Sequence, residues 1–305
     1  MHKKVIGVDL GATFVKMGIV DEKARVYLRR EIKTPFNVKP KELIPTLISN
    51  IEYIIKDAGL KKKDILGIGI GVPGPVDSEK GIVHYFPNIK GWEEVALKPI
   101  LEKGLGLRVE LDNDVNAMTL GEYRFGAGKG ADNVICLTLG TGVGGGIIID
   151  KKLYRGSSMC AGEIGHMPIN EKGPMCNCGG IACLERYIGN RYILNKAKEA
   201  FRSNITLEEL NRLAKKGNKD ALKVWEDVAR KLAVALTAVI NLLNPDKVII
   251  GGGVSKAGLL ILRPLRKEVK LRAMKVQAKH VKIVLARLGT DAGIIGASLL
   301  VEEID

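Results

Sequence analysis

One histidine and three cysteines gather in a short, glycine-rich stretch of the sequence. His166, Cys176, Cys178 and Cys183 form the pattern H-x9-C-x-C-x4-C. Three thiolates and one imidazole suit tetrahedral Zn²⁺, and four protein ligands leave no open position for a catalytic water. We therefore expect a structural zinc site. A redox pair is less favoured because the stretch contains no C-x-x-C, and free buried thiols are the remaining alternative.

Two carboxylates flank this pattern. Glu163 precedes His166 in "AGEIGH", and Glu185 follows Cys183 in "CLE". If one imidazole nitrogen binds the metal, the other stays available for a hydrogen bond. Two carboxylates and an imidazole offer the acceptors and donors that sugar hydroxyls need. We expect the metal to hold a sugar-binding loop in place and to take no part in a chemical step.

A third group of polar residues lies in "LDNDVNAMTLGE", residues 111–122. Asn113 and Asp114 end an expected strand and lead into an expected helix. A carboxylate there could accept the proton of a reacting hydroxyl. The alternative interpretation is that Asp112, Asn113 or Asp114 simply caps the helix.

Three glycine-containing turns lie within residues 9–21, 137–146 and 248–258. Glycine lets the backbone approach a phosphate closely, and Asp9 at a strand end could hold Mg²⁺ directly or through water. None of the turns is a Walker A loop or a Rossmann fingerprint, but together they favour a bound nucleotide. The residues assigned to it are Asp9, Gly11, Ala12, Thr13, Lys16, Gly140, Thr141, Gly142, Gly251, Gly252 and Gly253.

The formal net charge of the 305-residue chain is +14, which raises the question of nucleic acid. Basic and acidic residues are interleaved, however, so a charged surface with an anionic substrate is favoured over a nucleic-acid partner. The longest apolar stretch, residues 232–243, is shorter than the ~20 residues that a bilayer requires. A strand-like pattern follows Met1 with no signal-peptide character. We expect a cytoplasmic protein with reduced cysteines and no membrane partner.

Both halves of the chain begin with a strand, a glycine turn and another strand, which predicts two α/β lobes facing each other across a cleft. In the first half we expect three antiparallel strands in 3–35, a helix in 40–59, a strand from 65, a helix in 92–106, a strand in 108–114 and a helix in 115–126. In the second half we expect strands in 133–156, helices in 183–243, a strand in 247–253, a helix in 256–273, a strand in 281–288 and a last helix in 292–303.

The sequence resembles the ROK family (repressors, uncharacterised frames and sugar kinases), and within it the glucokinase type. The similar segments are "DLGATFVKMGIVD", "GVPGPVD", "LDNDVNAMTLGE", "LTLGTGVGGGIIID", "AGEIGH" and "CNCGGIACLE". The resemblance implies an α/β, two-lobed actin-like ATPase (ribonuclease H-like) fold with a cleft between the lobes. Residues 1–122 plus 290–305 would form the small lobe and residues 123–289 the large lobe.

The resemblance also implies an activity: transfer of the ATP γ-phosphoryl group to the 6-hydroxyl of a hexose, with glucose expected. It implies Mg²⁺ with ATP, a structural Zn²⁺ on His166, Cys176, Cys178 and Cys183, and a homodimer or homotetramer. Asp114 would be the general base. Asn113, Glu163, His166 and Glu185 would bind the sugar, with Gly74 and Asn88 at its border.

Several alternatives stay open. The hexose could be fructose, mannose or an N-acetylhexosamine. A sugar-sensing regulator is the main rival, because family repressors share this body. Such repressors carry a helix-turn-helix segment ahead of it, and here the first expected strand starts within a few residues of Met1, which argues for the kinase. A filament-forming or chaperone-like ATPase of the same superfold is a more distant option.

Overall fold

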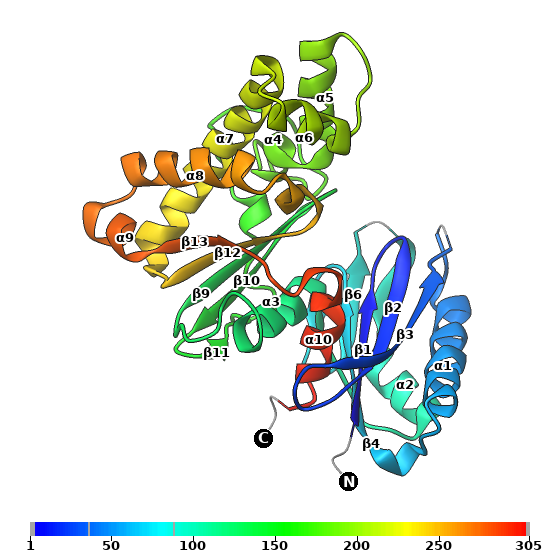
Figure 1. Cartoon of the computed structure of the whole chain (residues 1–305). Helices are drawn as coiled ribbons and strands as arrows, with labels where there is room; N and C mark the ends of the chain where they lie inside the picture. Colours follow the sequence, from blue (N-terminus) through cyan, green and yellow to red (C-terminus); the bar gives the residue numbers. More distant parts are fainter. Residues whose placement is uncertain (1–3, 36, 88, 303–305) are drawn as a thin grey trace. The chain divides into compact units, whose positions relative to one another are not determined.

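The computed structural model describes residues 4–35, 37–87 and 89–302 of the chain. It divides into two compact units (Figure 1). Unit 1 comprises residues 1–129, 153–161 and 288–305, and unit 2 comprises residues 130–152 and 162–287. The lobe boundaries expected from the sequence, after residues 122 and 289, stay a prediction.

Unit 1 is built on a five-stranded sheet with the order β3-β2-β1-β4-β8. β1 pairs antiparallel with β2 and parallel with β4, which in turn pairs parallel with β8. The strands are β1 (Lys4–Leu10), β2 (Phe14–Val20), β3 (Val26–Lys33), β4 (Ile65–Val72) and β8 (Val109–Asn113), and the helices are α1 (Pro40–Asp57), α2 (Leu97–Leu105), α3 (Asp114–Arg124) and α10 (Ala292–Leu299). Figure 1 shows α1 and α10 on opposite sides of this sheet.

The alternation of side chains along β1 decides what each face of the sheet packs against. Ile6, Val8 and Leu10 are fully buried in one core with Leu47 and Ile51 of α1. The intervening residues face the other way, toward α10.

On the α10 face the sheet carries glycines where a side chain would not fit. A Cβ atom on Gly7 would overlap the carbonyl oxygen of Ile294, and one on Gly69 would overlap that of Ala297. Gly296 likewise meets the carbonyl oxygen of Ala117 in α3. Backbone therefore packs directly on backbone, and α10 lies unusually close to β1, β4 and α3.

We expect Gly69→Ala to destabilise the protein by about 1–3 kcal/mol or more, because the added methyl must displace backbone and cannot be absorbed by a flexible side chain. Urea unfolding measures the change. Gly140→Ala is the control, because a Cβ atom at position 140 would meet no other heavy atom within 4 Å. Equal unfolding midpoints for the two variants would contradict this account of the packing.

A second, three-stranded sheet in unit 1 corrects the sequence prediction of a helix over residues 92–106. Its antiparallel strands are β5 (Val76–Asp77), β6 (Ile82–Phe86) and β7 (Ile89–Val95), and α2 begins only at Leu97. Trp92 is buried, stacks on Phe86 with ring centroids 4.3 Å apart, and donates its indole N–H to the carbonyl oxygen of Val38 at 3.0 Å. The spacing of apolar residues favours a helix here, but the packing of the Trp92 side chain keeps residues 92–95 in a strand.

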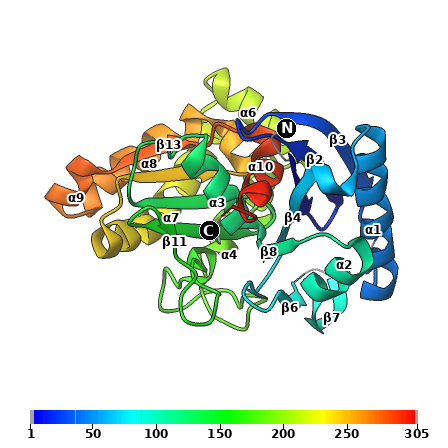
Figure 2. The same cartoon turned by 90° about the horizontal axis from the view of Figure 1, so that it is seen from below.

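Unit 2 has its own five-stranded sheet with the order β11-β10-β9-β12-β13. β12 runs parallel to β9 and β13, and β10 pairs antiparallel with β9. The strands are β9 (Val134–Leu139), β10 (Val143–Ile149), β11 (Lys152–Leu153), β12 (Lys247–Gly251) and β13 (Lys282–Leu285), and the helices are α4 (Glu185–Ile188), α5 (Asn190–Phe201), α6 (Leu207–Lys215), α7 (Lys219–Leu243), α8 (Leu259–Arg272) and α9 (Lys275–His280). Figure 2 gives a second view of these elements.

The long helix α7 supplies much of the core of unit 2. Trp225, Leu232 and Leu236 are fully buried there together with Leu137 of β9 and Ile250 of β12. Among the residues that the structure describes, no helix combines the length and apolar character needed to cross a membrane.

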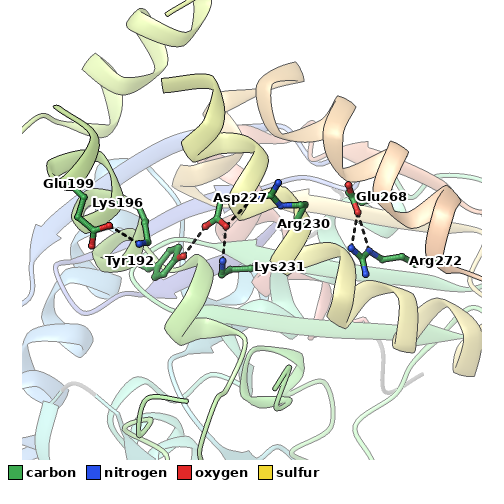
Figure 3. Close-up of polar contacts among 8 residues, drawn as sticks. All are labelled: Tyr192, Lys196, Glu199, Asp227, Arg230, Lys231, Glu268 and Arg272. Atoms are coloured by element: carbon green, nitrogen blue, oxygen red, sulfur yellow. Dashed lines mark hydrogen bonds and ion pairs between the residues drawn. The ribbon is translucent and has the colours of Figure 1, made fainter. Parts of the chain in front are cut away.

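A polar cluster joins α5 to α7 on the surface of unit 2 (Figure 3). Asp227 accepts hydrogen bonds from the Tyr192 hydroxyl at 2.8 Å and from Lys231 Nζ at 2.7 Å. Burial alone would raise the pKa of Asp227, but these hydrogen bonds outweigh it and hold the pKa below its ordinary value. The hydrogen bond between Tyr192 and Asp227 therefore connects α5 to α7.

Candidate active site

The four residues of the H-x9-C-x-C-x4-C pattern converge in unit 2. Their ligand atoms all lie within 4.8 Å of one another. His166 Nδ1 is 3.6 Å from Cys176 Sγ, and Cys178 Sγ is 3.7 Å from Cys183 Sγ. A tetrahedral zinc with Zn–S near 2.3 Å and Zn–N near 2.05 Å requires edges of about 3.6 Å for N···S and about 3.8 Å for S···S. The donor set therefore suits zinc in its chemistry, and these two distances match the edges of a zinc tetrahedron.

Tight backbone turns bring the three thiols together. The N–H of Cys176 donates to the carbonyl oxygen of Gly180 at 2.8 Å, and Gly179 takes a φ of +88°, which favours glycine. The N–H of Gly180 donates to Cys178 Sγ and lowers the pKa of that thiol. Burial raises the pKa of the Cys183 thiol to about 12.

The imidazole of His166 links the metal ligands to the Glu163 carboxylate. Its Nδ1 points to the thiols, and its Nε2 lies 3.8 Å from Glu163 Oε2. Burial raises the pKa of Glu163; the nearby Glu185 adds to this rise and His166 opposes it. Glu163, His166 and Glu185 therefore form one polar group beside the metal-ligand cluster.

Glu185 is held by the turn between β9 and β10. Its Oε2 accepts the backbone N–H of Val143 at 2.9 Å. A Cβ atom on Gly142 would lie 2.7 Å from the same oxygen, so glycine at 142 leaves room for the carboxylate. One of the glycines assigned to the nucleotide thus also shapes the carboxylate group.

Asn113 and Asp114 lie in unit 1, where β8 ends and α3 begins. Asn113 is the N-cap of α3, and its Oδ1 accepts the N–H groups of Val115 at 2.8 Å and Asn116 at 3.3 Å. The capping interpretation is therefore confirmed for Asn113. Asp114 opens the helix, and the partial positive charge of a helix N-terminus stabilises a carboxylate there.

The Asn113 side chain also reaches Gly74. Its Nδ2 donates to the carbonyl oxygen of Gly74 at 3.0 Å. Gly74 has a φ of +86°, and a Cβ atom there would lie 2.5 Å from the carbonyl oxygen of Tyr85, so this position requires glycine. Asn88, the other residue expected at the border of the sugar, lies outside the described residues.

In unit 1, the first glycine turn joins β1 to β2. Gly11 N–H donates to the carbonyl oxygen of Phe14 at 3.0 Å, which places Ala12 and Thr13 at the exposed tip. Asp9 pairs with Lys16 across the two strands. Burial raises the pKa of Asp9, and the Lys16 charge opposes this rise. A Cβ atom on Gly293 would lie 2.5 Å from Asp9 Oδ2, so glycine in α10 makes room for the carboxylate.

The other two glycine turns lie in unit 2. Gly140 N–H donates to the carbonyl oxygen of Gly142 at 2.9 Å, with Thr141 between them. Gly251 ends β12, and Gly252 takes a φ of +80° against the backbone of Leu139. The triple glycine does not run straight into α8 as predicted, because a 3₁₀ helix over Gly253–Ala257 comes first.

A cavity of about 620 Å³ lies beside this third turn, wholly within unit 2. Its size is within the range of small-molecule sites. Four of its lining residues are basic and one is acidic, so it favours an anionic ligand. It is lined by Asn190, Leu207, Glu208, Asn211, Arg212, Lys215, Lys216, Gly253 and Lys256.

Comparison with known proteins places the chain in a family. The model of the ROK family matches residues 5–304. The chain belongs to the ROK family. Its mixed α/β fold is that of the actin-like ATPases, as the family resemblance implied.

ROK relatives of this chain include enzymes and regulators. It is 35% identical to a glucokinase of Thermotoga maritima over 98% of either chain. It is 34% identical to a putative xylose repressor of a Caldicellulosiruptor species, over 97% of this chain and 77% of that protein. The structure of a ROK glucokinase from Streptomyces griseus in complex with glucose and AMPPNP matches with a TM-score of 0.83 and 34% identity, over 97% of this chain and 98% of that chain.

In this ROK chain the predicted site residues fall into separate groups. Asp9, Gly11, Ala12, Thr13, Lys16, Gly74, Asn113 and Asp114 lie in unit 1, and the remaining described ones lie in unit 2. Within unit 2 the structure brings together Glu163, His166 and Glu185. Sequence reasoning missed every lining residue of the cavity except Gly253. The basic pair Lys215 and Lys216, at the end of a helical pattern, was the available signal.

Proposed function

We propose that this protein is an ATP-dependent hexose kinase that phosphorylates the 6-hydroxyl of glucose. The observation that carries the proposal is the group of Glu163, His166 and Glu185, in which the imidazole that faces the carboxylate also belongs to the metal-ligand cluster. Such a group is suited to recognising several adjacent hydroxyls. The glucokinases among the relatives support the same substrate class.

In the proposed reaction Asp114 accepts the proton of the sugar 6-hydroxyl as its oxygen attacks the γ-phosphorus of ATP. The bond from the γ-phosphorus to the bridging oxygen breaks, and ADP leaves with that electron pair. Asn113, Glu163, His166 and Glu185 bind the other sugar hydroxyls, with Gly74 and Asn88 at the border. Mg²⁺ bound with ATP would spread the phosphate charge, and Asp9 would hold it directly or through water.

His166, Cys176, Cys178 and Cys183 would hold the structural Zn²⁺. The Nδ1 atom of His166 would then be bound, and its Nε2–H would be fixed as a donor toward Glu163 and the sugar. These four residues already supply the ligands that tetrahedral zinc needs. The role of the site is to orient the sugar-binding side chains.

For the nucleotide we assign the 620 Å³ cavity of unit 2 to adenine and ribose. The glycines at 251–253 would border the nucleoside. The turns at Gly11–Thr13 and Gly140–Gly142 would border the phosphates, and the backbone N–H groups that follow Gly11 and Gly140 would face them. Arg212, Lys215, Lys216 and Lys256 give the cavity the charge that a nucleotide requires.

A sugar-sensing regulator is the second candidate, and the 34% identity to a putative xylose repressor favours it. The sugar-binding group would be the same in both cases. The two functions differ in whether bound sugar is phosphorylated.

A coupled ADP-release assay with Mg-ATP against a sugar panel tests the proposal. The panel holds glucose, fructose, mannose, N-acetylhexosamines and xylose, and calorimetry with each sugar runs in parallel. We expect glucose-dependent turnover. Turnover with another hexose alone would correct the substrate. Sugar binding without any turnover would favour the regulator.

A further inference from the structure

A buried carboxylate lies directly before the proposed base. Asp112 is 1% exposed. Its Oδ1 accepts the backbone N–H of Asn113 at 2.6 Å and the Nδ2 of Asn116 at 2.8 Å, and its Oδ2 accepts the Nε of Arg155 at 2.7 Å. A buried carboxylate is stable only with a charged partner and further hydrogen bonds, and this one has both.

These contacts fix the first turn of α3. The Asp112 carboxylate holds the backbone of the N-cap Asn113 and the side chain of Asn116, with Asp114 between them. The orientation of the Asn116 side-chain amide shows the effect of the hydrogen bond to Asp112. Among the described residues, its buried Oδ1 has no hydrogen-bond partner, because the amide is turned so that its NH₂ serves Asp112. A buried oxygen without a partner is unfavourable, so the bond to Asp112 dictates the orientation.

Arg155 comes from a distinctive part of the chain. Residues 153–161 belong to unit 1, although the chain on either side of them belongs to unit 2. The carbonyl oxygen of Arg155 accepts the N–H of Ala161 at 2.9 Å, which closes the segment into a loop. Glu163 follows two residues later. The loop anchored by Arg155 thus leads directly into the segment that carries Glu163 and His166.

We propose that Arg155 is a positioning residue for catalysis: through Asp112 it fixes the Asn113–Asp114 corner that supplies the general base. This inference rests on the proposed kinase function. Arg155 need not touch the sugar or the nucleotide. Its guanidinium orients the Asp112 carboxylate, and Asp112 holds the backbone from which the Asp114 side chain extends.

The test compares Arg155→Met with Arg25→Met. Arg25 is a matched control because it also pairs with a buried aspartate of unit 1, its Nε lying 2.9 Å from Asp21 Oδ2. Asp21 follows β2 at the end of the sheet opposite to Asp112, as the strand registers require. Both variants remove an arginine that pairs with a buried aspartate, and only one removes it beside Asp114.

We expect Arg155→Met to lower kcat about 100-fold, the effect of moving a catalytic group by about 1 Å. The KM for ATP and the zinc content should stay unchanged. Ethylguanidinium, which resembles the end of the arginine side chain, should restore part of the kcat of Arg155→Ala. A variant that had only lost stability would not regain kcat in this way. Arg25→Met should keep the wild-type kcat. Arg155→Lys, which retains the charge, is the variant to use if Arg155→Met does not fold.

Hydrogen exchange provides a readout independent of turnover. Amides in residues 112–116 should exchange about tenfold faster in Arg155→Met than in Arg25→Met. Unchanged exchange there, or a wild-type kcat in Arg155→Met, would overturn the inference. If wild-type protein turned over no sugar, the kinase proposal would fail, and exchange would still decide whether Arg155 fixes this corner.

Discussion

We expect Asp114→Asn to lower kcat by about 10²–10⁴-fold, the usual contribution of a general base, and to leave sugar binding nearly unchanged. An amide has the shape of the carboxylate, and it can still accept the Val115 N–H that Asp114 Oδ1 receives at 2.9 Å. It cannot take up a proton from the 6-hydroxyl. The ADP-release assay gives kcat, and calorimetry with glucose gives the affinity.

Asp220→Asn is the matched control. Asp220 lies in the first turn of α7 behind an asparagine N-cap, Asn218, so this variant also removes a carboxylate from a helix N-terminus. It should keep full turnover. Full turnover in Asp114→Asn would exclude Asp114 as the base, and loss of glucose binding in that variant would make it a sugar ligand instead.

The second large effect is expected at the metal-ligand cluster. Cys183→Ser should abolish stoichiometric zinc binding and raise the KM for the sugar at least about tenfold. Zinc binding by such ligand sets is worth about 10–16 kcal/mol in small folded peptides, so the loop should lose most of its order with the metal. His166 would then no longer be held against Glu163. Elemental analysis, glucose titration and thermal unfolding measure these changes.

Cys160→Ser is the control for loss of a thiol, since Cys160 lies outside the cluster and is half-buried. It should bind zinc and glucose as the wild type does. If Cys183→Ser behaved in the same way, the three cysteines would be ordinary thiols and His166 would not be a metal ligand.

Much of the fold follows from local sequence patterns. The two strand–glycine–strand units were predictable because apolar runs are broken by glycine at the turns, and the start of α3 because asparagine is a good N-cap. The four zinc-type ligands could be recognised because their spacing is local and their chemistry is specific.

The errors occur where distant parts of the chain decide. Residues 92–95 have helical spacing, but the Trp92 indole is fixed by Phe86 and by the carbonyl oxygen of Val38, far away in sequence. The pairing of Arg155 with Asp112 could not be predicted from the sequence, because Asp112 lies 43 residues before Arg155. The lining residues of the cavity come from three separate segments that only the folded unit brings together.

The close packing of α10 has a consequence for how the protein is made. Gly7 and Gly69 are synthesised early, but α10, the helix that covers them, comes after the whole of unit 2. About 160 residues separate the first long part of unit 1 from its last part, which is roughly 8–30 s of translation at about 5–20 residues per second. During that time the part of the unit 1 sheet around Gly7 and Gly69 lacks the helix that covers it. Unit 2, although second in the sequence, can complete its fold first.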